Sequence, residues 1–225
     1  MIIVKNDFFK PDIANLIARG AELYQWSYSH KSDVNDPAHN KFFVCHLWND
    51  SSKHNFFYTL WKIIQNEVSS VQDCKCWRII ANGQVKGQNG NWHTDHGDKT
   101  VLYYPMPWKP EWGGSTYLKI ADSKTEIQYK KNQLVVFDSA ISHYGSSPTV
   151  DNILRISIAF NLRLESERPL ESPISEHDFV SALKEALDRG KPDTAVLASA
   201  AVSRFGQEPF SARAGAVIGR FREVV

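Results

Sequence analysis

Apolar residues recur at helical spacing twice in the first third of the chain. Residues 11–25 are predicted to form a helix, and Pro11 suits its first turn because the N–H that proline lacks is not needed there. A second helix is predicted to follow Ser51 or Ser52, either of which can act as its N-cap. The apolar stripes of the two helices are formed by Ile13, Leu16, Ile17, Gly20 and Tyr24, and by Phe57, Leu60, Trp61, Ile64 and Val68.

Polar residues dominate the segment between these helices. Residues 27–40 contain the break Asp36-Pro37 and are predicted to form a long loop. Residues 41–48 are rich in aromatic side chains and predict a short strand. Because loops beside a rigid sheet often carry binding residues, residues 27–40 are also a candidate substrate lid.

After residue 69 the apolar spacing changes to the alternation typical of strands. Turn residues separate the segments, for example at Asn82-Gly83, Asn89-Gly90 and Gly113-Gly114. The predicted strands cover residues 75–81, 91–96, 99–106, 115–120, 125–129, 133–137, 142–145 and 154–162.

This order of elements predicts a mainly β fold with flanking helices. About eight short strands after two helices are typical of a double-stranded β-helix, the jelly-roll of cupin-like proteins. A doubly wound parallel sheet would need helices between the strands, and these connections are too short for them. The two helices are expected to pack on the outside of a sheet.

The composition of the chain changes near Glu165. All 7 Trp and all 8 Tyr precede this point, and the remainder is rich in Ala, Ser and Arg. We therefore expect one domain over residues 1–165 and a helical extension over residues 166–225. The extension is interpreted as structural or as a dimer contact rather than as a substrate-recognition module.

Composition and charge exclude several classes of protein. The chain has 225 residues, 42% of them hydrophobic, and a net charge of +1, so nothing attracts the whole chain to nucleic acid or to an anionic membrane. No apolar run approaches the length of about 18 residues that spans a membrane. Cys45, Cys74 and Cys76 are few and odd in number, which favours reduced thiols and a cytoplasmic location. Cys74 and Cys76 are expected to be ordinary strand residues rather than a metal or redox pair.

Candidate metal ligands lie between residues 91 and 143. His93 and Asp95 are two residues apart, so in a strand both side chains lie on one face. His143 can add a third ligand from another strand. Two imidazoles and one carboxylate form the ligand set of non-haem Fe(II) oxygenases. His96 is excluded from the set, because it points to the opposite face from Asp95.

The motif continues with Arg155 and Ser157, twelve and fourteen residues after His143. This order of residues, H-x-D, a distal His and then R-x-S, resembles the 2-oxoglutarate-dependent Fe(II) dioxygenases. The segment Thr100-Val101-Leu102-Tyr103-Tyr104, followed by Trp108 and Gly113-Gly114, is similar to the prolyl 4-hydroxylase-like branch. The resemblance covers residues 78–162.

The resemblance implies a role for each residue of the motif. His93, Asp95 and His143 would bind Fe(II), and Arg155 would bind the distal carboxylate of 2-oxoglutarate with help from Ser157 and Tyr104. Of Tyr103 and Tyr104 only one can do so, because neighbours in a strand point to opposite faces. Asn82, Gln84 and Gln88 precede the metal motif, and either cosubstrate binding or turn formation explains them equally well.

The same resemblance implies the reaction and its cofactors. With Fe(II), 2-oxoglutarate and O2, the protein would hydroxylate an unactivated C–H bond and release succinate and CO2. Ascorbate is left open as a further cofactor. Relatives that halogenate replace the carboxylate ligand with a small residue, so the presence of Asp95 predicts oxygen insertion instead.

The substrate is expected to be a protein or peptide, with a prolyl residue as the site of hydroxylation. A free amino acid or another small molecule is an alternative, as are a non-catalytic cupin-like binding module and a zinc hydrolase or isomerase. Zinc would fit the triad, but it would give Arg155 and Ser157 no purpose. No nucleic acid or membrane partner is expected, and a homo-oligomer is left open.

Overall fold

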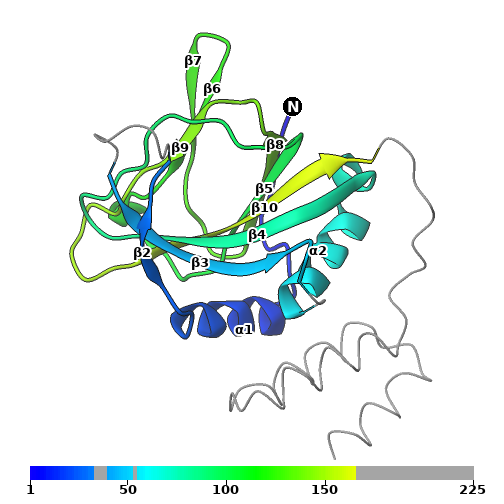
Figure 1. The fold of residues 1–225 in the computed structure, drawn as a ribbon. Helices are drawn as coiled ribbons and strands as arrows, with labels where there is room; N and C mark the ends of the chain where they lie inside the picture. The colour runs from blue at the N-terminus through cyan, green and yellow to red at the C-terminus, as the bar shows by residue number, and fades with distance from the viewer. Residues whose placement is uncertain (33–39, 53–54, 166–225) are drawn as a thin grey trace, which may run out of the picture.

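Ten strands form two antiparallel sheets in the computed structural model, which describes residues 1–32, 40–52 and 55–165 (Figure 1). The larger sheet has seven strands in the order β1-β8-β5-β10-β4-β3-β2, and the smaller has the order β7-β6-β9. The strands are β1 (Ile2–Lys5), β2 (Ser27–His30), β3 (Phe42–Asn49), β4 (Cys74–Gln84), β5 (Lys99–Tyr104), β6 (Thr116–Ile120), β7 (Ser123–Ile127), β8 (Gln133–Asp138), β9 (His143–Gly145) and β10 (Arg155–Leu164).

The arrangement of these strands confirms the predicted jelly-roll. The first five strands lie in the large sheet, and β6 and β7 lie in the small sheet. The chain then crosses between the sheets at each strand, with β8 in the large sheet, β9 in the small sheet and β10 at the centre of the large sheet. Every pair in both sheets is antiparallel, as in double-sheet jelly-rolls and unlike doubly wound folds.

The large sheet is buried on both of its faces. Along β10, Ile156, Ile158 and Phe160 face the helices, while Arg155 and Ser157 face the interior of the jelly-roll. This is the period of two expected of a strand. Along β10, the outer face is therefore apolar, and the inner face carries the polar residues.

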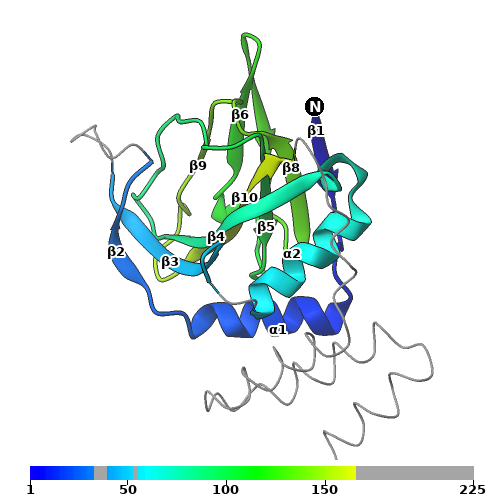
Figure 2. The same cartoon turned by 45° about the vertical axis from the view of Figure 1, so that its right-hand side comes forward.

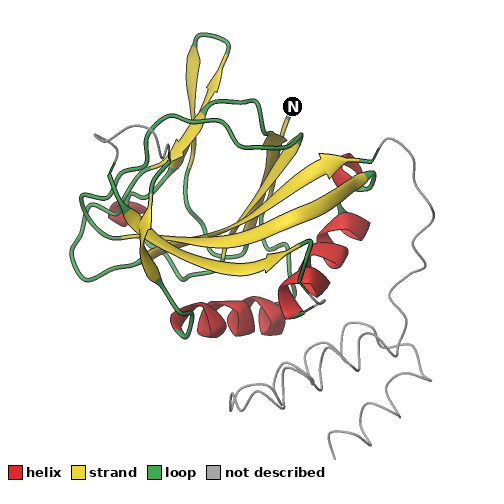
Figure 3. Cartoon of the chain, viewed as in Figure 1, coloured by secondary structure: helices red, strands yellow, loops and turns green. Residues whose placement is uncertain are grey.

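Two helices cover the outer face of the large sheet, α1 (Pro11–Glu22) and α2 (Phe56–Glu67), as Figures 2 and 3 show. Both confirm the predicted helices, with α1 ending three residues earlier than expected. Their buried faces share one apolar cluster with the sheet, in which Ile17, Trp61 and Ile64 are at most 1% exposed. Two short 3-10 helices, η1 (Ser69–Val71) and η2 (Pro110–Trp112), lie in connections.

The N-cap predicted for the second helix is wrong. Asn55, and neither Ser51 nor Ser52, caps α2, because its side-chain oxygen accepts hydrogen bonds from the N–H groups of Phe57 and Tyr58 at 3.0 and 3.2 Å. The Asn55 amide also donates to the carbonyl of Leu47 at 2.8 Å. Asn55 thus joins the start of α2 to β3.

Several predicted boundaries are also wrong. The short strands β1 and β2 were not expected, and β2 occupies the start of the predicted loop 27–40. Gly83 lies inside β4 rather than in a turn, since Trp26, Leu154 and Phe43 pack where a Cβ would be. Residues 91–96 form an extended segment with a single β-bridge at His93, not a strand.

The three cysteines are free and buried. Cys74 and Cys76 lie in the apolar cluster between sheet and helices, so they are the strand residues that the sequence predicted. Burial raises the pKa of the Cys74 thiol to about 11, which keeps it protonated and unreactive at neutral pH.

None of the helices that the structure describes is long and apolar enough to cross a membrane. The predicted extension over residues 166–225 lies outside the described residues, as do residues 33–39 of the candidate lid.

Replacing Asn55 with Ala is expected to destabilise the domain. Loss of an N-cap costs about 0.5–2 kcal/mol, and each kcal/mol lowers the Tm of a chain of this size by about 2–4 °C. Asn66→Ala is the matched control, since Asn66 is an exposed residue of the same helix. Thermal unfolding followed by circular dichroism measures both variants, and equal Tm values would disprove the capping role.

Candidate metal centre

His93 and His143 are brought together by a β-bridge between the extended segment 91–96 and strand β9. The N–H of His143 donates to the carbonyl of His93 at 2.8 Å, and the N–H of His93 donates back at 3.1 Å. The centres of the two imidazole rings are 4.4 Å apart. Residues 91–96 do not form the strand predicted from the sequence. The bridge nevertheless brings the imidazole rings of His93 and His143 next to each other.

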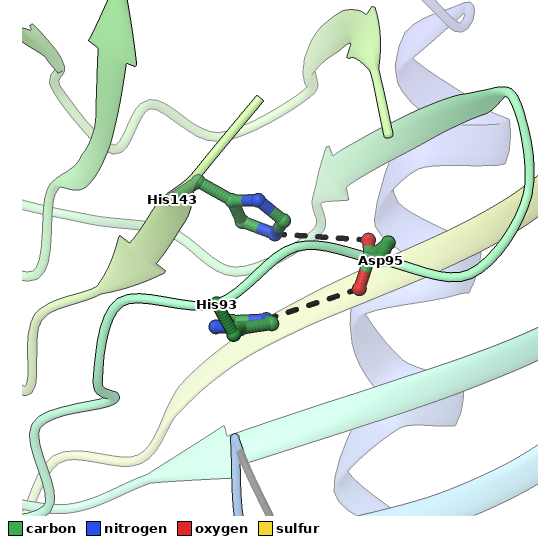
Figure 4. A group of neighbouring side chains, drawn as sticks. All are labelled: His93, Asp95 and His143. Atoms are coloured by element: carbon green, nitrogen blue, oxygen red, sulfur yellow. Dashed lines mark ion pairs between the residues drawn. The ribbon is translucent and has the colours of Figure 1, made fainter. Parts of the chain in front are cut away.

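Asp95 completes the cluster, and Figure 4 shows its carboxylate to one side of the two rings, facing both of them. One oxygen lies 3.8 Å from Nε2 of His93 and the other 3.6 Å from Nε2 of His143. One ligand atom of each residue lies within 4.8 Å of the others. No other group of three His, Cys, Asp or Glu side chains in residues 1–32, 40–52 and 55–165 has this arrangement.

Hydrogen bonds set the tautomer of both histidines. Nδ1 of His93 lies 2.8 Å from the carbonyl of Asn91, and Nδ1 of His143 lies 2.9 Å from the carbonyl of Ile141. Since a carbonyl only accepts, each Nδ1 carries the hydrogen, and the lone pair of each Nε2 faces Asp95. Burial lowers the pKa of His143, which favours the neutral ring that binds metals.

The carboxylate of Asp95 is held by its neighbours in the large sheet. The hydroxyl of Thr100 donates to it at 2.7 Å, and the N–H of Asp95 donates to the carbonyl of Ser139 at 3.0 Å. Thr100 also lies 2.9 Å from the hydroxyl of Ser139. Two neutral imidazoles and an oriented carboxylate therefore fit a divalent metal such as Fe(II), bound on one side only.

The triad lies on the wall of a cavity of about 520 Å³ inside the jelly-roll. Alternate residues of the adjacent strands β4 and β10 form the floor of this cavity. The floor residues are Arg78, Ile80, Asn82 and Gln84 of β4, and Arg155, Ser157, Ala159 and Asn161 of β10.

Arg155 is the most deeply buried cation in the cavity, at 1% exposure. Its guanidinium donates to the carbonyl of Gly114 at 2.6 Å, to Gln84 at 2.9 Å, to Thr116 at 2.9 Å and to Ser157 at 3.4 Å. All four acceptors are neutral, so no described carboxylate balances its charge. Four contacts leave one of its five N–H groups free, and the bond to Ser157 is long.

Arg155 is thus suited to bind an anion. Burial lowers the pKa of its guanidinium, although arginine stays charged in proteins. Buried charges are normally paired, and a planar guanidinium binds carboxylates in a bidentate manner.

The other residues predicted for the cosubstrate lie nearby in different positions. Ser157 and Asn82 line the cavity next to each other in the register of the sheet, and the side-chain oxygen of Asn82 is buried without a hydrogen-bond partner. Tyr104 does not line the cavity. Its hydroxyl donates to Thr116 at 2.7 Å, and Tyr103 faces the opposite core, as the alternation predicted.

Several residues of the cavity were missed in the sequence. Thr116 accepts hydrogen bonds from both Tyr104 and Arg155, so its own hydroxyl hydrogen is left for a ligand. Arg78 and Asn161 were assigned to core strands without a role. The alternation of polar residues along β4 and β10 was the available signal for them.

Aromatic residues form a second hollow beside the cavity, next to Gly90. The ring of Trp92 packs edge-on against Tyr144 with centres 4.6 Å apart, and Tyr144 stacks on Tyr117 at 5.0 Å. Trp92 is 43% exposed and lines both hollows. Trp108, by contrast, packs on Tyr129 in the core.

Solved structures with similar folds include several 2-oxoglutarate oxygenases. A Pseudomonas putida prolyl-4-hydroxylase has a TM-score of 0.57 at 15% identity, covering 73% of this chain and 93% of that one. A prolyl hydroxylase from Trichoplax adhaerens has a TM-score of 0.56 at 16% identity, covering 76% of this chain and 87% of that one. That structure is a complex with a peptide fragment of the hypoxia inducible factor oxygen degradation domain.

The viral collagen prolyl hydroxylase of Paramecium Bursaria Chlorella virus-1, in complex with 2-oxoglutarate, has a TM-score of 0.52 at 14% identity. The match covers 73% of this chain and 96% of that one. Neither a protein-family model nor a curated protein matches the sequence. The chain therefore has the jelly-roll fold that these 2-oxoglutarate oxygenase structures share.

Proposed function

We propose that this protein is an Fe(II)- and 2-oxoglutarate-dependent oxygenase that hydroxylates an unactivated C–H bond. The observation that carries the proposal is the presence, in one cavity, of a His-Asp-His cluster and a buried arginine without a carboxylate partner. A zinc hydrolase would need the cluster alone. A non-catalytic binding module would need neither.

The metal ligands in this proposal are Nε2 of His93, Nε2 of His143 and the carboxylate of Asp95. An Fe(II) ion bound there, with 2-oxoglutarate and O2, supplies the oxidative chemistry that yields succinate, CO2 and the hydroxylated product. The protein orients the three ligands through the carbonyls of Asn91 and Ile141 and through the hydroxyl of Thr100. Such outer contacts fix ligand geometry and raise metal affinity.

Arg155 binds the distal carboxylate of 2-oxoglutarate in this proposal, with hydroxyl hydrogens from Ser157 and Thr116. Tyr104 is a positioning residue, because it reaches the site only through Thr116. The middle of the cavity floor is apolar, because Ile80 and Ala159 pair there in the register of β4 and β10.

The finer proposal is that the substrate contains proline. The similar structures of prolyl hydroxylases support it, and one of them holds a peptide. The exposed aromatic residues Trp92, Tyr117 and Tyr144 beside the cavity also support it, since proline-rich segments dock on aromatic-lined grooves. A free amino acid or another small molecule is the alternative substrate. Ascorbate, a homo-oligomer and a cytoplasmic location stay predictions.

Succinate formation from 2-oxoglutarate tests the proposed function. Purified protein with Fe(II) is expected to produce succinate, and a true substrate increases the rate and gains 16 mass units for one oxygen atom. The panel contains proline-containing peptides, free proline and other free amino acids. Absence of both succinate and 2-oxoglutarate binding in the Fe(II)-loaded protein would contradict the proposal.

Replacing His93, Asp95 or His143 with Ala is expected to abolish turnover and weaken metal binding, because each change removes one ligand of three. Competition with a metal-binding dye measures the affinity. His96→Ala is the matched control, since His96 is adjacent to Asp95, lines the same cavity and lies outside the cluster. A His143→Ala variant with full metal content would show that the ligand set is wrong.

Replacing Arg155 with Leu is expected to raise the Kd of 2-oxoglutarate by about 10- to 150-fold, since hydrogen bonds to charged groups contribute about 1.5–3 kcal/mol. Arg155→Lys keeps the charge but loses the bidentate geometry, so it should restore only part of the affinity. Anaerobic calorimetry measures the Kd, and circular dichroism checks the fold. Lys119→Ala, at an exposed position, is the control, and unchanged binding in Arg155→Leu would assign the carboxylate to another cation.

A further inference from the structure

The cavity has a second basic end, opposite Arg155. In the register of β4 and β10, Arg155 pairs with Gln84 and Asn161 pairs with Arg78. Six residues separate the two pairs along each strand, which corresponds to about 20 Å. All four side chains lie on the cavity floor, so the two arginines occupy its opposite ends.

The metal cluster lies between these two ends. Strand β9 runs from His143 to Gly145, where a Cβ would lie 3.1 Å from the Arg155 guanidinium. At the other end, Asn161 pairs with Thr100 of β5, whose hydroxyl donates to Asp95 at 2.7 Å. A ligand at either end therefore extends toward the same three side chains.

Arg78 has hydrogen-bonding capacity that the described residues do not use. Its Nε donates to the side-chain oxygen of Asn161 at 3.1 Å, and its guanidinium lies 4.8 Å from the Trp77 ring. Its two terminal nitrogens have no hydrogen-bond acceptor among the described residues. They carry four N–H donors that are available to a ligand.

Asn161 adds an unsatisfied donor at the same end. It is 1% exposed, and its amide nitrogen is buried without a hydrogen-bond partner. Its oxygen is already bonded to Arg78, and that bond turns the amide N–H groups away from Arg78. A buried polar group without a partner is costly, and this one lines a cavity where a ligand could supply the missing acceptor.

We propose that Arg78 and Asn161 bind a carboxylate of the primary substrate. This inference rests on the proposed function and names the substrate class, which is a free amino acid or the C-terminal residue of a peptide. The unused groups of Arg78 and Asn161 are all donors, and a carboxylate offers acceptors only. The carboxylate is thereby anchored, and the adjacent carbon atoms extend toward the metal cluster.

One molecule of 2-oxoglutarate cannot occupy both ends. Its five carbons span four C–C bonds of about 1.5 Å each, which is far less than the roughly 20 Å of strand between the two pairs. Both guanidinium groups are held at their own ends, Arg155 by Gly114 and Gln84 and Arg78 by Asn161. The second end therefore serves a second molecule.

The charges in the cavity favour a second anion as well. Arg78, Arg155 and a divalent metal carry four positive charges, and Asp95 carries one negative charge. Lys31 has an interaction of its own and is left out of this count. A 2-oxoglutarate dianion leaves one positive charge, and one substrate carboxylate balances it in a site where unpaired charge is costly.

The test compares carboxylates with their amides. Protein loaded with Fe(II) and 2-oxoglutarate is titrated without oxygen with free L-amino acids, proline included, with dipeptides, and with the C-terminal amides of both. Calorimetry measures binding, and succinate formation in air measures turnover. At least one carboxylate should bind about 10-fold or more tightly than its amide. The free amino acids and the dipeptides distinguish the two sources of the carboxylate.

Arg78→Met and Asn161→Leu are the informative variants, since both keep most of the side-chain volume. Each should weaken binding of the carboxylate by about 10-fold or more while the affinities for metal and 2-oxoglutarate stay within about twofold, a range that corresponds to about 0.4 kcal/mol. Arg163→Met is the matched control, because Arg163 lies over the same Trp77 ring at the same 4.8 Å but is exposed and does not line the cavity. Arg163→Met should bind the carboxylate with the same affinity as the unmodified protein.

Three results would overturn the inference. The first is equal binding of carboxylates and their amides, and the second is normal carboxylate binding by Arg78→Met. The third is loss of metal or 2-oxoglutarate binding in Arg78→Met. The last result would mean that Arg78 only balances Asp95 or holds the cosubstrate. Failure of the proposed function is distinguishable, because the unmodified protein would then bind no 2-oxoglutarate before any substrate is added.

Discussion

The alternation of side chains along β10 is the constraint on which both the core and the cavity depend. This strand lies between β4 and β5, so both of its neighbours are hydrogen-bonded and its register is set on each side. Ile156, Ile158 and Phe160 face the helices, and Arg155 and Ser157 face the cavity. A shift of one residue would bury the arginine among helix side chains and expose apolar groups to the metal cluster.

The two faces of this sheet differ in what they contribute. The outer face, with α1 and α2, is an apolar layer that stabilises the fold. The inner face carries Arg155, Asn82 and Asn161, and the two asparagines each have a side-chain atom without a partner. Such groups reduce the stability of the domain. We interpret this loss as the cost of keeping donors and acceptors available to ligands.

The elements with a strong local pattern were predictable from the sequence. The two helices have apolar stripes, and most strands in the second half are bounded by turn residues, so their existence and order were predicted. The order of His93, Asp95, His143 and Arg155 carried the hypothesis for the site. The side chains of the triad are close in space, as that hypothesis requires.

The features that sequence reasoning missed depend on distant partners. Strand β1 has only four residues and is stabilised by β8, which follows it by about 130 residues, so no local signal marks it. The segment 91–96 is extended because of one bridge to His143 rather than because of its own pattern. Arg78 and Asn161 lie in two predicted strands to which no site role was given, because it becomes visible that they are neighbours only when β4 and β10 are paired.

The proposed function places specificity in the ends of the cavity rather than in the fold. Similar folds at 14–16% identity share the scaffold, and one scaffold supports many substrates. The apolar middle, with Ile80 and Leu102, discriminates weakly, because one methylene changes binding by about 10- to 200-fold. Polar groups discriminate more strongly, by about 10⁴- to 10⁵-fold when a substrate fails to pair with them. Arg155 and Arg78 belong to register pairs that are separated by about 20 Å of strand. In the function proposed above, each end therefore selects its own molecule, and the position of the second end determines which substrate carbon lies near the metal cluster.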